Sequence, residues 1–140
     1  FGARPEERAV LPLTDADAEL DKSTSNPKCM LLSKIVGGRY LGDLATILYN
    51  SYNASGKSDG AEGVRGVGGG LMTTELVARV LGSSGSAEVK ELMARSLNIS
   101  DATDHETAAL RRVCGMLVHR ASRVAAAALV ALLDMIQAAP

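Results

Sequence analysis

Aromatic side chains are almost absent from this 140-residue sequence, which has one Phe and no Trp. Apolar residues nevertheless make up 46% of the chain, so a core must be built from Leu, Val, Ala, Met and Ile. This composition favours helix packed on helix over an aromatic-rich sandwich, and the length suits one domain. We therefore predict a single, mainly α domain of about five helices.

The sequence also lacks an excess of either charge, with 15 basic and 16 acidic residues. Nucleic-acid binding needs a basic surface, so nucleic acid is not expected as a partner. The two cysteines, Cys29 and Cys114, form no CxxC and no metal-binding spacing. We expect two buried, reduced thiols, in a reducing compartment such as the cytoplasm or mitochondrion, and no metal or cofactor.

Long apolar runs are missing as well. The longest, 124–133, ends at Asp134 and is too short to span a bilayer, so no membrane span is predicted. No signal peptide is recognisable, and the chain begins with Phe1, which we interpret as a mature product or a fragment.

Helical periodicity and capping residues predict the elements that are present. Thr14 and Asp17 have the spacing of a helix cap, and Asn26 followed by Pro27 predicts another helix start. The last helix is the strongest prediction, with Asp104 as its cap. The five expected helices are a short one from Thr14, then 27–52, 73–81, 86–97 and a long one after Asp104.

Glycine is concentrated in two places. Residues 53–70 are rich in Gly and Ser and predict a flexible loop. Its GVGGG at 66–70 fits neither a dinucleotide fingerprint nor a P-loop. Gly37, Gly38 and Gly42 instead lie within the helix predicted over 27–52, where each costs about 1 kcal/mol relative to alanine. We expect another element or a ligand to approach the backbone there.

The last helix changes character along its length. Before Val124 one face is apolar and the other carries Arg111, Arg112, His119 and Arg123. After it the helix is apolar on all sides, which is typical of a helix buried on all sides. We therefore predict an apolar patch over 124–136 that needs a sheet or another protein subunit to cover it.

Few residues suggest chemistry. His105 is expected to be solvated at the start of the last helix, and His119 to lie on its polar face. An acidic cluster is formed by Asp15, Asp17, Glu19 and Asp21. It lacks the glycine turn that a calcium-binding loop needs, so we interpret it as a solvated helix face. No catalytic residues are predicted from spacing.

Two segments resemble the hexokinase family, LPLTDADAELDKSTSNP at 11–27 and KIVGGRYLGDL at 34–44. The second is similar to the Phe-Glu-Lys-Met-Ile-Ser-Gly-x-Tyr-Leu-Gly-Glu helix of the family's large domain. The helix carrying Arg120 and Ala121 resembles the family's Arg-Ala-Ala helix. The matching positions of the first two segments are Leu11, Pro12, Thr14, Asp17, Asp21, Ser25, Asn26, Pro27, Lys34, Gly38, Tyr40, Leu41 and Gly42.

The resemblance implies that 1–140 is a partial domain, the helical layer of the large C-terminal subdomain without most of its sheet. It also exposes departures. Ser33 replaces the sugar-binding Glu of the family, and serine cannot act as a charged bidentate acceptor. The catalytic Asp, the Asp-Gly-Gly-x-Asn phosphate segment and the small domain are absent from this sequence. Ala78 stands where the family has a Ser.

The resemblance places the remaining nucleotide contacts at Gly38, Arg39 and Thr74, although ATP and hexose are not expected as ligands. Three functions follow. The first is a non-catalytic structural or accessory subunit of a larger assembly, a pseudoenzyme whose partners are other protein subunits. The second is a fragment of an active ATP-dependent hexokinase of glycolysis. The third is a small sensor that still binds a sugar or a nucleotide.

Overall fold

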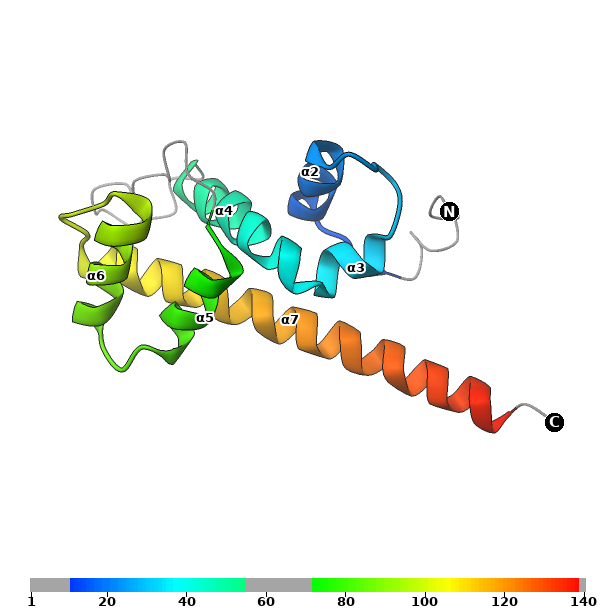
Figure 1. Cartoon of the computed structure of the whole chain (residues 1–140). Helices are drawn as coiled ribbons and strands as arrows, with labels where there is room; N and C mark the ends of the chain where they lie inside the picture. The colour runs from blue at the N-terminus through cyan, green and yellow to red at the C-terminus, as the bar shows by residue number, and fades with distance from the viewer. Residues whose placement is uncertain (1–10, 55–71, 139–140) are drawn as a thin grey trace.

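The computed structural model describes residues 11–54 and 72–138, and these form a mainly α structure. Within these ranges there are six helices and no strand, which confirms the predicted class (Figure 1). The helices are α2 (Asp15–Ser23), α3 (Leu31–Val36), α4 (Gly38–Ala54), α5 (Thr74–Gly82), α6 (Ser86–Leu97) and α7 (Asp104–Gln137). The loop predicted over 53–70 lies outside the described residues from residue 55 onward.

The single helix predicted over 27–52 is wrong, because the structure divides it into α3 and α4. Gly37 ends α3 in an extended conformation, and its N–H donates to the carbonyl of Ser33. The predicted start at Asn26 and Pro27 is also wrong. The helix begins at Leu31, preceded by Met30 in the left-handed region at φ 54°.

The other helix ends follow local capping chemistry. Thr14 and Asp17 form the capping box that their spacing predicts, and Asn98 ends α6 in the left-handed conformation. Helix α7 differs by one residue from the prediction. Thr103 is its cap and Asp104 its first residue, because the Thr103 hydroxyl accepts the N–H of Glu106 while the Glu106 carboxylate accepts the N–H of Thr103.

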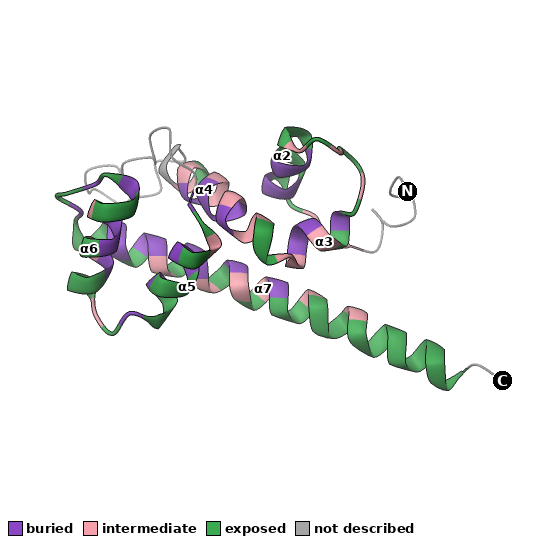
Figure 2. Cartoon of the chain, viewed as in Figure 1, coloured by how far each residue is buried: buried purple, intermediate pink, exposed green. Residues whose placement is uncertain are grey.

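The core lies where α4, α5 and the first half of α7 pack together, with α6 at one end and α2 above α4 (Figure 1). It consists of aliphatic side chains around one buried tyrosine, Tyr49. Burial along α7 stops near Ala121, and the rest of the helix projects beyond the other helices (Figure 2). The most deeply buried side chains include Tyr49, Leu20, Ile35, Leu44, Met93, Leu110 and Leu117.

Gly42 marks a close approach between α4 and the segment that enters α5. A Cβ built on Gly42 would lie 2.1 Å from the carbonyl oxygen of Met72, which is much closer than van der Waals contact. The Thr46 hydroxyl holds this segment by accepting the N–H of Met72 at 2.8 Å and donating to the carbonyl of Gly42 at 3.1 Å. The expectation that another element approaches the helix glycines is thus confirmed at Gly42.

The two cysteines are both free but differ in burial. Cys114 is buried in the core, and burial raises the pKa of its thiol to about 12. Cys29 is half-buried, so the prediction of two buried thiols is wrong for this residue.

We expect a thiol reagent at about pH 8 to modify one cysteine of the native chain, because a buried thiol with a raised pKa supplies little thiolate. The second thiol should react after unfolding in denaturant. In the Cys29→Ser variant the fast phase should disappear. Rapid modification of both thiols in the native chain would contradict this assignment.

Candidate functional site

The three predicted nucleotide contacts lie together where α4 and α5 begin. The Thr74 hydroxyl donates to the carbonyl of Gly38, so the two helix starts are joined directly. Gly38 and Arg39 are exposed, and the Arg39 guanidinium lies 5.9 Å from the ring centre of Tyr40. The structure therefore brings Gly38, Arg39 and Thr74 to one place.

A groove of about 460 Å³ lies next to this junction, between α2 and α4. Arg39 lines it together with two carboxylates, Glu19 and Asp43. The hydroxyls of Ser23 and Thr24 also line it but already donate to the carbonyls of Leu20 and Asp21. With one cation facing two acids, the lining of the groove is net negative, which disfavours a polyphosphate.

Ser33, which stands at the family's sugar-binding Glu, is half-buried in α3. Its carbonyl accepts the N–H of Gly37 at 2.7 Å, which is the last hydrogen bond of α3 before Gly37 turns to an extended conformation. Neither histidine is buried, since His105 and His119 are both exposed on α7. Among the described residues, no group of His, Cys, Asp and Glu is arranged to hold a metal ion.

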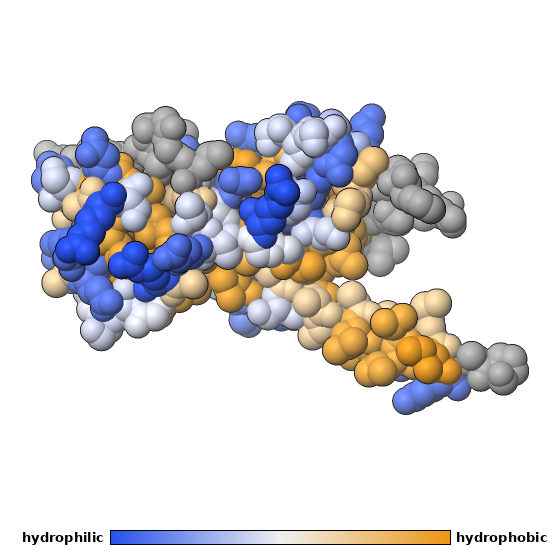
Figure 3. All heavy atoms as spheres, in the orientation of Figure 1, coloured by the Kyte–Doolittle hydropathy of each residue, from blue (hydrophilic) through white to orange (hydrophobic). Residues whose placement is uncertain are grey.

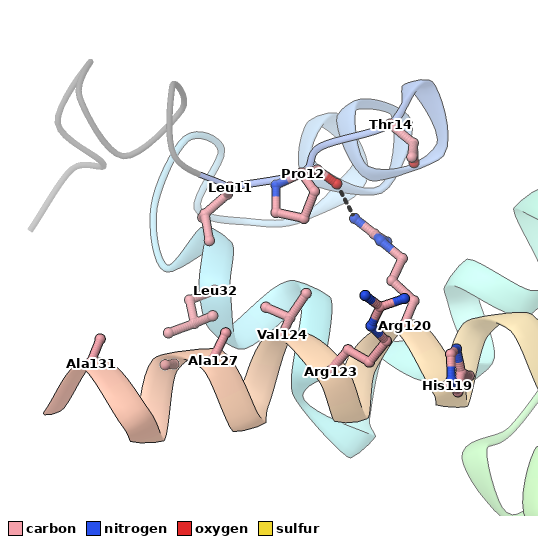
Figure 4. Close-up of a pocket in the computed structure, with 11 residues that line it drawn as sticks. Leu11, Pro12, Thr14, Leu32, His119, Arg120, Arg123, Val124, Ala127 and Ala131 are labelled. Atoms are coloured by element: carbon pink, nitrogen blue, oxygen red, sulfur yellow. Dashed lines mark hydrogen bonds between the residues drawn. The ribbon is translucent and has the colours of Figure 1, made fainter. Parts of the chain in front are cut away.

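A bidentate ion pair connects the start of the described chain to the middle of α7. Arg120 on α7 donates from Nη1 to one carboxylate oxygen of Asp17 at 2.9 Å and from Nη2 to the other at 2.7 Å. Nη2 also donates to the carbonyl of Pro12 at 2.7 Å (Figure 4). Because Thr14 donates to Asp17 from both its amide and its hydroxyl, this carboxylate is fully engaged. Arg120 therefore fixes α2 and the preceding segment to α7.

Burial raises the pKa of Asp17, but the hydrogen bonds from Arg120 and Thr14 outweigh it and hold the pKa below the usual 3.8. A lowered pKa in the folded state stabilises the fold at all pH values above the unfolded pKa. That stability is lost as the pH falls below about 4 and through the lower folded value.

We expect the free energy of unfolding to fall as the pH drops below about 4 in the native chain, and to fall much less in Arg120→Gln. The variant should also be less stable near neutral pH, because Asp17 then stays buried without its cation. Urea unfolding at a series of pH values measures both effects. Parallel pH profiles for the two proteins would show that Arg120 does not set the pKa of Asp17.

A second buried ion pair holds the connection between α2 and α3. The Lys34 ammonium lies 2.7 Å from a carboxylate oxygen of Asp21, and the two side chains are only 4% and 9% exposed. Lys34 also donates to the carbonyl of Asn26 at 2.8 Å, and the Lys28 amide donates to Asp21 at 2.9 Å. These bonds fold the connection back on α2 and explain why no helix begins at Pro27.

The interpretation of the acidic cluster as a solvated helix face is wrong for two of its four residues. Asp15 and Glu19 are exposed, but Asp17 and Asp21 are buried and paired with cations. Sequence spacing missed these roles because Arg120 lies 103 positions from Asp17. The helical period was a signal that could have revealed their burial. Asp17 and Asp21 share the face of α2 that also carries the apolar Leu20.

The projecting end of α7, residues 124–137, carries most of the large apolar side chains that are exposed among the described residues. Leu129, Met135 and Ile136 are 59%, 71% and 63% exposed, which confirms the apolar patch predicted over 124–136 (Figure 3). Among the described helices, only α7 is long and apolar enough to cross a membrane. The core helices of soluble proteins can also meet these two criteria of length and composition. The absence of a membrane span stays a prediction.

An apolar groove of about 730 Å³ borders the first part of this projecting end. Leu11 and Pro12 form one wall and Leu32 of α3 adjoins them, while α7 forms the opposite wall (Figure 4). The lining residues on α7 are His119, Arg120, Arg123, Val124, Ala127, Ala128 and Ala131.

These features define a class: a helical unit held by buried ion pairs, with one long helix partly uncovered. The chain matches the family model described as Hexokinase over residues 1–139, so it belongs to the hexokinase family. It is 27% identical over 142 residues to Hexokinase-7 of Oryza sativa subsp. japonica, covering 91% of this chain and 28% of that protein. It is 28% identical over 127 residues to Hexokinase-3 of the same plant, covering 88% of this chain and 25% of that protein. The chain thus spans about a quarter of the length of these curated relatives.

Proposed function

We propose that this chain is a non-catalytic structural or accessory subunit of a larger protein assembly, derived from the helical layer of a hexokinase large domain. The observation that carries the proposal is the projecting end of α7, which is apolar on all sides over residues 124–133 and largely lacks cover from the other described helices. Exposed apolar surface of this extent is typical of a protein interface.

The use of the buried charges supports a structural role. Asp17 and Asp21 each hold a cation, and Glu106 accepts the amide of its own helix cap. These carboxylates therefore stabilise helix ends and connections. At the sugar-binding position of the family, Ser33 offers a neutral hydroxyl instead of a carboxylate, which weakens hydrogen bonding to sugar hydroxyls.

A fragment of an active ATP-dependent hexokinase is the second candidate. It is favoured by the family match over residues 1–139 and by the share of the relatives, about a quarter, that this chain spans. In that case the remainder of a longer polypeptide would cover α7 and supply the charged residues that phosphoryl transfer requires.

The two candidates predict different results in one assay. The longest natural product of the gene, with Ser33 in place, is incubated with glucose and ATP, and hexose phosphate is measured. A structural subunit gives no ATP-dependent product above the reaction without protein. Turnover by this protein would overturn the proposal and establish the second candidate.

Calorimetry with ATP tests the residual nucleotide contacts at Gly38, Arg39 and Thr74. The proposal expects no heat of binding at about millimolar ATP, a concentration that detects even weak ligands. Heat that is lost in both Arg39→Ala and Thr74→Val, with Arg95→Ala as the exposed control, would instead support a nucleotide sensor.

A further inference from the structure

We infer that the partner covering the projecting end of α7 is a second copy of this chain, paired antiparallel with Arg123 of each copy facing Asp134 of the other. The inference rests on the proposed function, because it names the protein that covers one face of this apolar end, whereas Leu129, Leu132 and Ile136 lie on the opposite face. It is carried by the placement of these two charges and by the shape of the groove beside them.

Arg123 and Asp134 lie on one face of α7. They are eleven positions apart, so their directions around the helix axis differ by only about 20° after three complete turns. Along the axis they are separated by about 16 Å. Both side chains are exposed, and neither forms an ion pair with another described residue. Between them this face carries Ala127 and Val130, so two opposite charges flank a small apolar surface.

Such a face is complementary to itself in one orientation. A twofold axis between Ala128 and Leu129 brings Arg123 opposite the partner's Asp134, and the same symmetry forms the second pair. It also brings Ala127 opposite the partner's Val130, where the small side chain permits close approach. A parallel arrangement in register would place like charges together, which is unfavourable. The antiparallel pair is an isologous interface of the kind found in most homodimers.

The groove between α7 and the Leu11–Pro12 segment fits the same arrangement. Its lining on α7 extends from His119 to Ala131, and the twofold axis brings these positions opposite the partner's residues 126–138. The projecting end of each copy thus lies along the groove of the other, where Leu11 and Leu32 add apolar contacts beyond the helix pair (Figure 4). Arg120 already binds Asp17, so Arg123 is the groove's available guanidinium for the partner's carboxylate.

A lipid bilayer fits this face less well. Burial of Asp134 in hydrocarbon would leave its carboxylate without a cation, which is costly. A second copy supplies that cation from Arg123 and needs no other component.

Charge reversal tests the inference on the full 140-residue chain. Sedimentation equilibrium from about 1 to about 200 µM should show a monomer–dimer equilibrium, with a Kd that rises with salt. Arg123→Glu alone, or Asp134→Lys alone, creates two like-charge contacts per dimer and should weaken the dimer about tenfold. The double variant Arg123→Glu/Asp134→Lys restores both pairs and should return the Kd to within about threefold of the original.

Arg112→Glu is the matched control, because it reverses an exposed arginine of α7 that lies outside the groove. It should leave the Kd unchanged, and circular dichroism should show equal helix content in all variants. A dimer that is indifferent to both single reversals, or that is not rescued by the double variant, would overturn the inference.

A monomer at every concentration would also overturn the inference. Binding of a fluorescent apolar dye then separates the two proposals. A monomer that binds the dye through α7 still needs a different partner, so the proposed structural role stands. A monomer that binds no dye removes the observation behind both proposals.

Discussion

Replacing Gly42 with alanine will destabilise the chain by about 3 kcal/mol or more, at the upper end of the usual cost of overpacking. The new Cβ would meet three backbone atoms, namely the oxygen and carbonyl carbon of Met72 and the carbonyl carbon of Thr73, at 2.1, 2.9 and 2.8 Å. Backbone atoms cannot rotate away as a side-chain end can. The segment is moreover held on α4 by the Thr46 hydroxyl, so α4 and the start of α5 must separate.

Gly115→Ala is the matched control, a glycine-to-alanine change within a helix of the same chain. The nearest atom to its Cβ would be a methyl carbon of Leu81 at 3.9 Å, which is ordinary contact. This variant should be more stable than the native chain by about 0.5 to 1 kcal/mol, because alanine loses less backbone entropy in a helix. Urea unfolding measures both changes. Equal effects at the two positions would contradict the close approach at Gly42.

Replacing Lys34 with methionine should destabilise the chain by about 3 kcal/mol or more, the usual result of removing one partner of a buried ion pair. The methionine fills a similar volume, so the effect comes from charge. Asp21 would keep the Lys28 amide as a donor but lose the ammonium at 2.7 Å. The carbonyl of Asn26 would lose its bond to Lys34 as well.

The double variant Lys34→Met/Asp21→Asn separates charge from packing. Removing the carboxylate that has lost its ammonium partner should recover part of the lost stability, so the double variant should be more stable than Lys34→Met alone. Lys22→Met is the control at an exposed lysine of α2 and should change the free energy of unfolding by less than about 0.5 kcal/mol. A double variant less stable than the single one would show that Asp21 and Lys34 do not act as a pair.

Helix class and most helix ends could be predicted from the sequence because they depend on neighbours in the chain. Thr14 with Asp17, Thr73 and Asn98 form caps through residues at most five positions away. The break at Gly37 could not be predicted from periodicity, since the apolar spacing continues across it. The connection before α3 depends on Asp21 binding Lys28 and Lys34, and these bonds override the preference of Asn26 and Pro27 for a helix start.

For the candidate site, too, some features could be predicted from the sequence and others depend on the fold. The resemblance in sequence brought Gly38, Arg39 and Thr74 into consideration, and the structure places them at one junction. It did not reveal that Asp17 and Arg120 form an ion pair, because the fold decides which residues meet across 103 positions. It also gave no indication that Glu19 and Asp43 share a groove with Arg39.

The uneven burial of α7 has a consequence for its motion. Its 34 residues extend about 51 Å, yet tertiary contacts hold mainly the part before Val124. The remaining two-fifths is about as long as an isolated peptide helix that is only marginally stable in water. Its amide hydrogens should therefore exchange through local fraying, while those near Leu117 exchange far more slowly. Any surface that covers this end also has to complete the folding of the helix, so association and local ordering are one event.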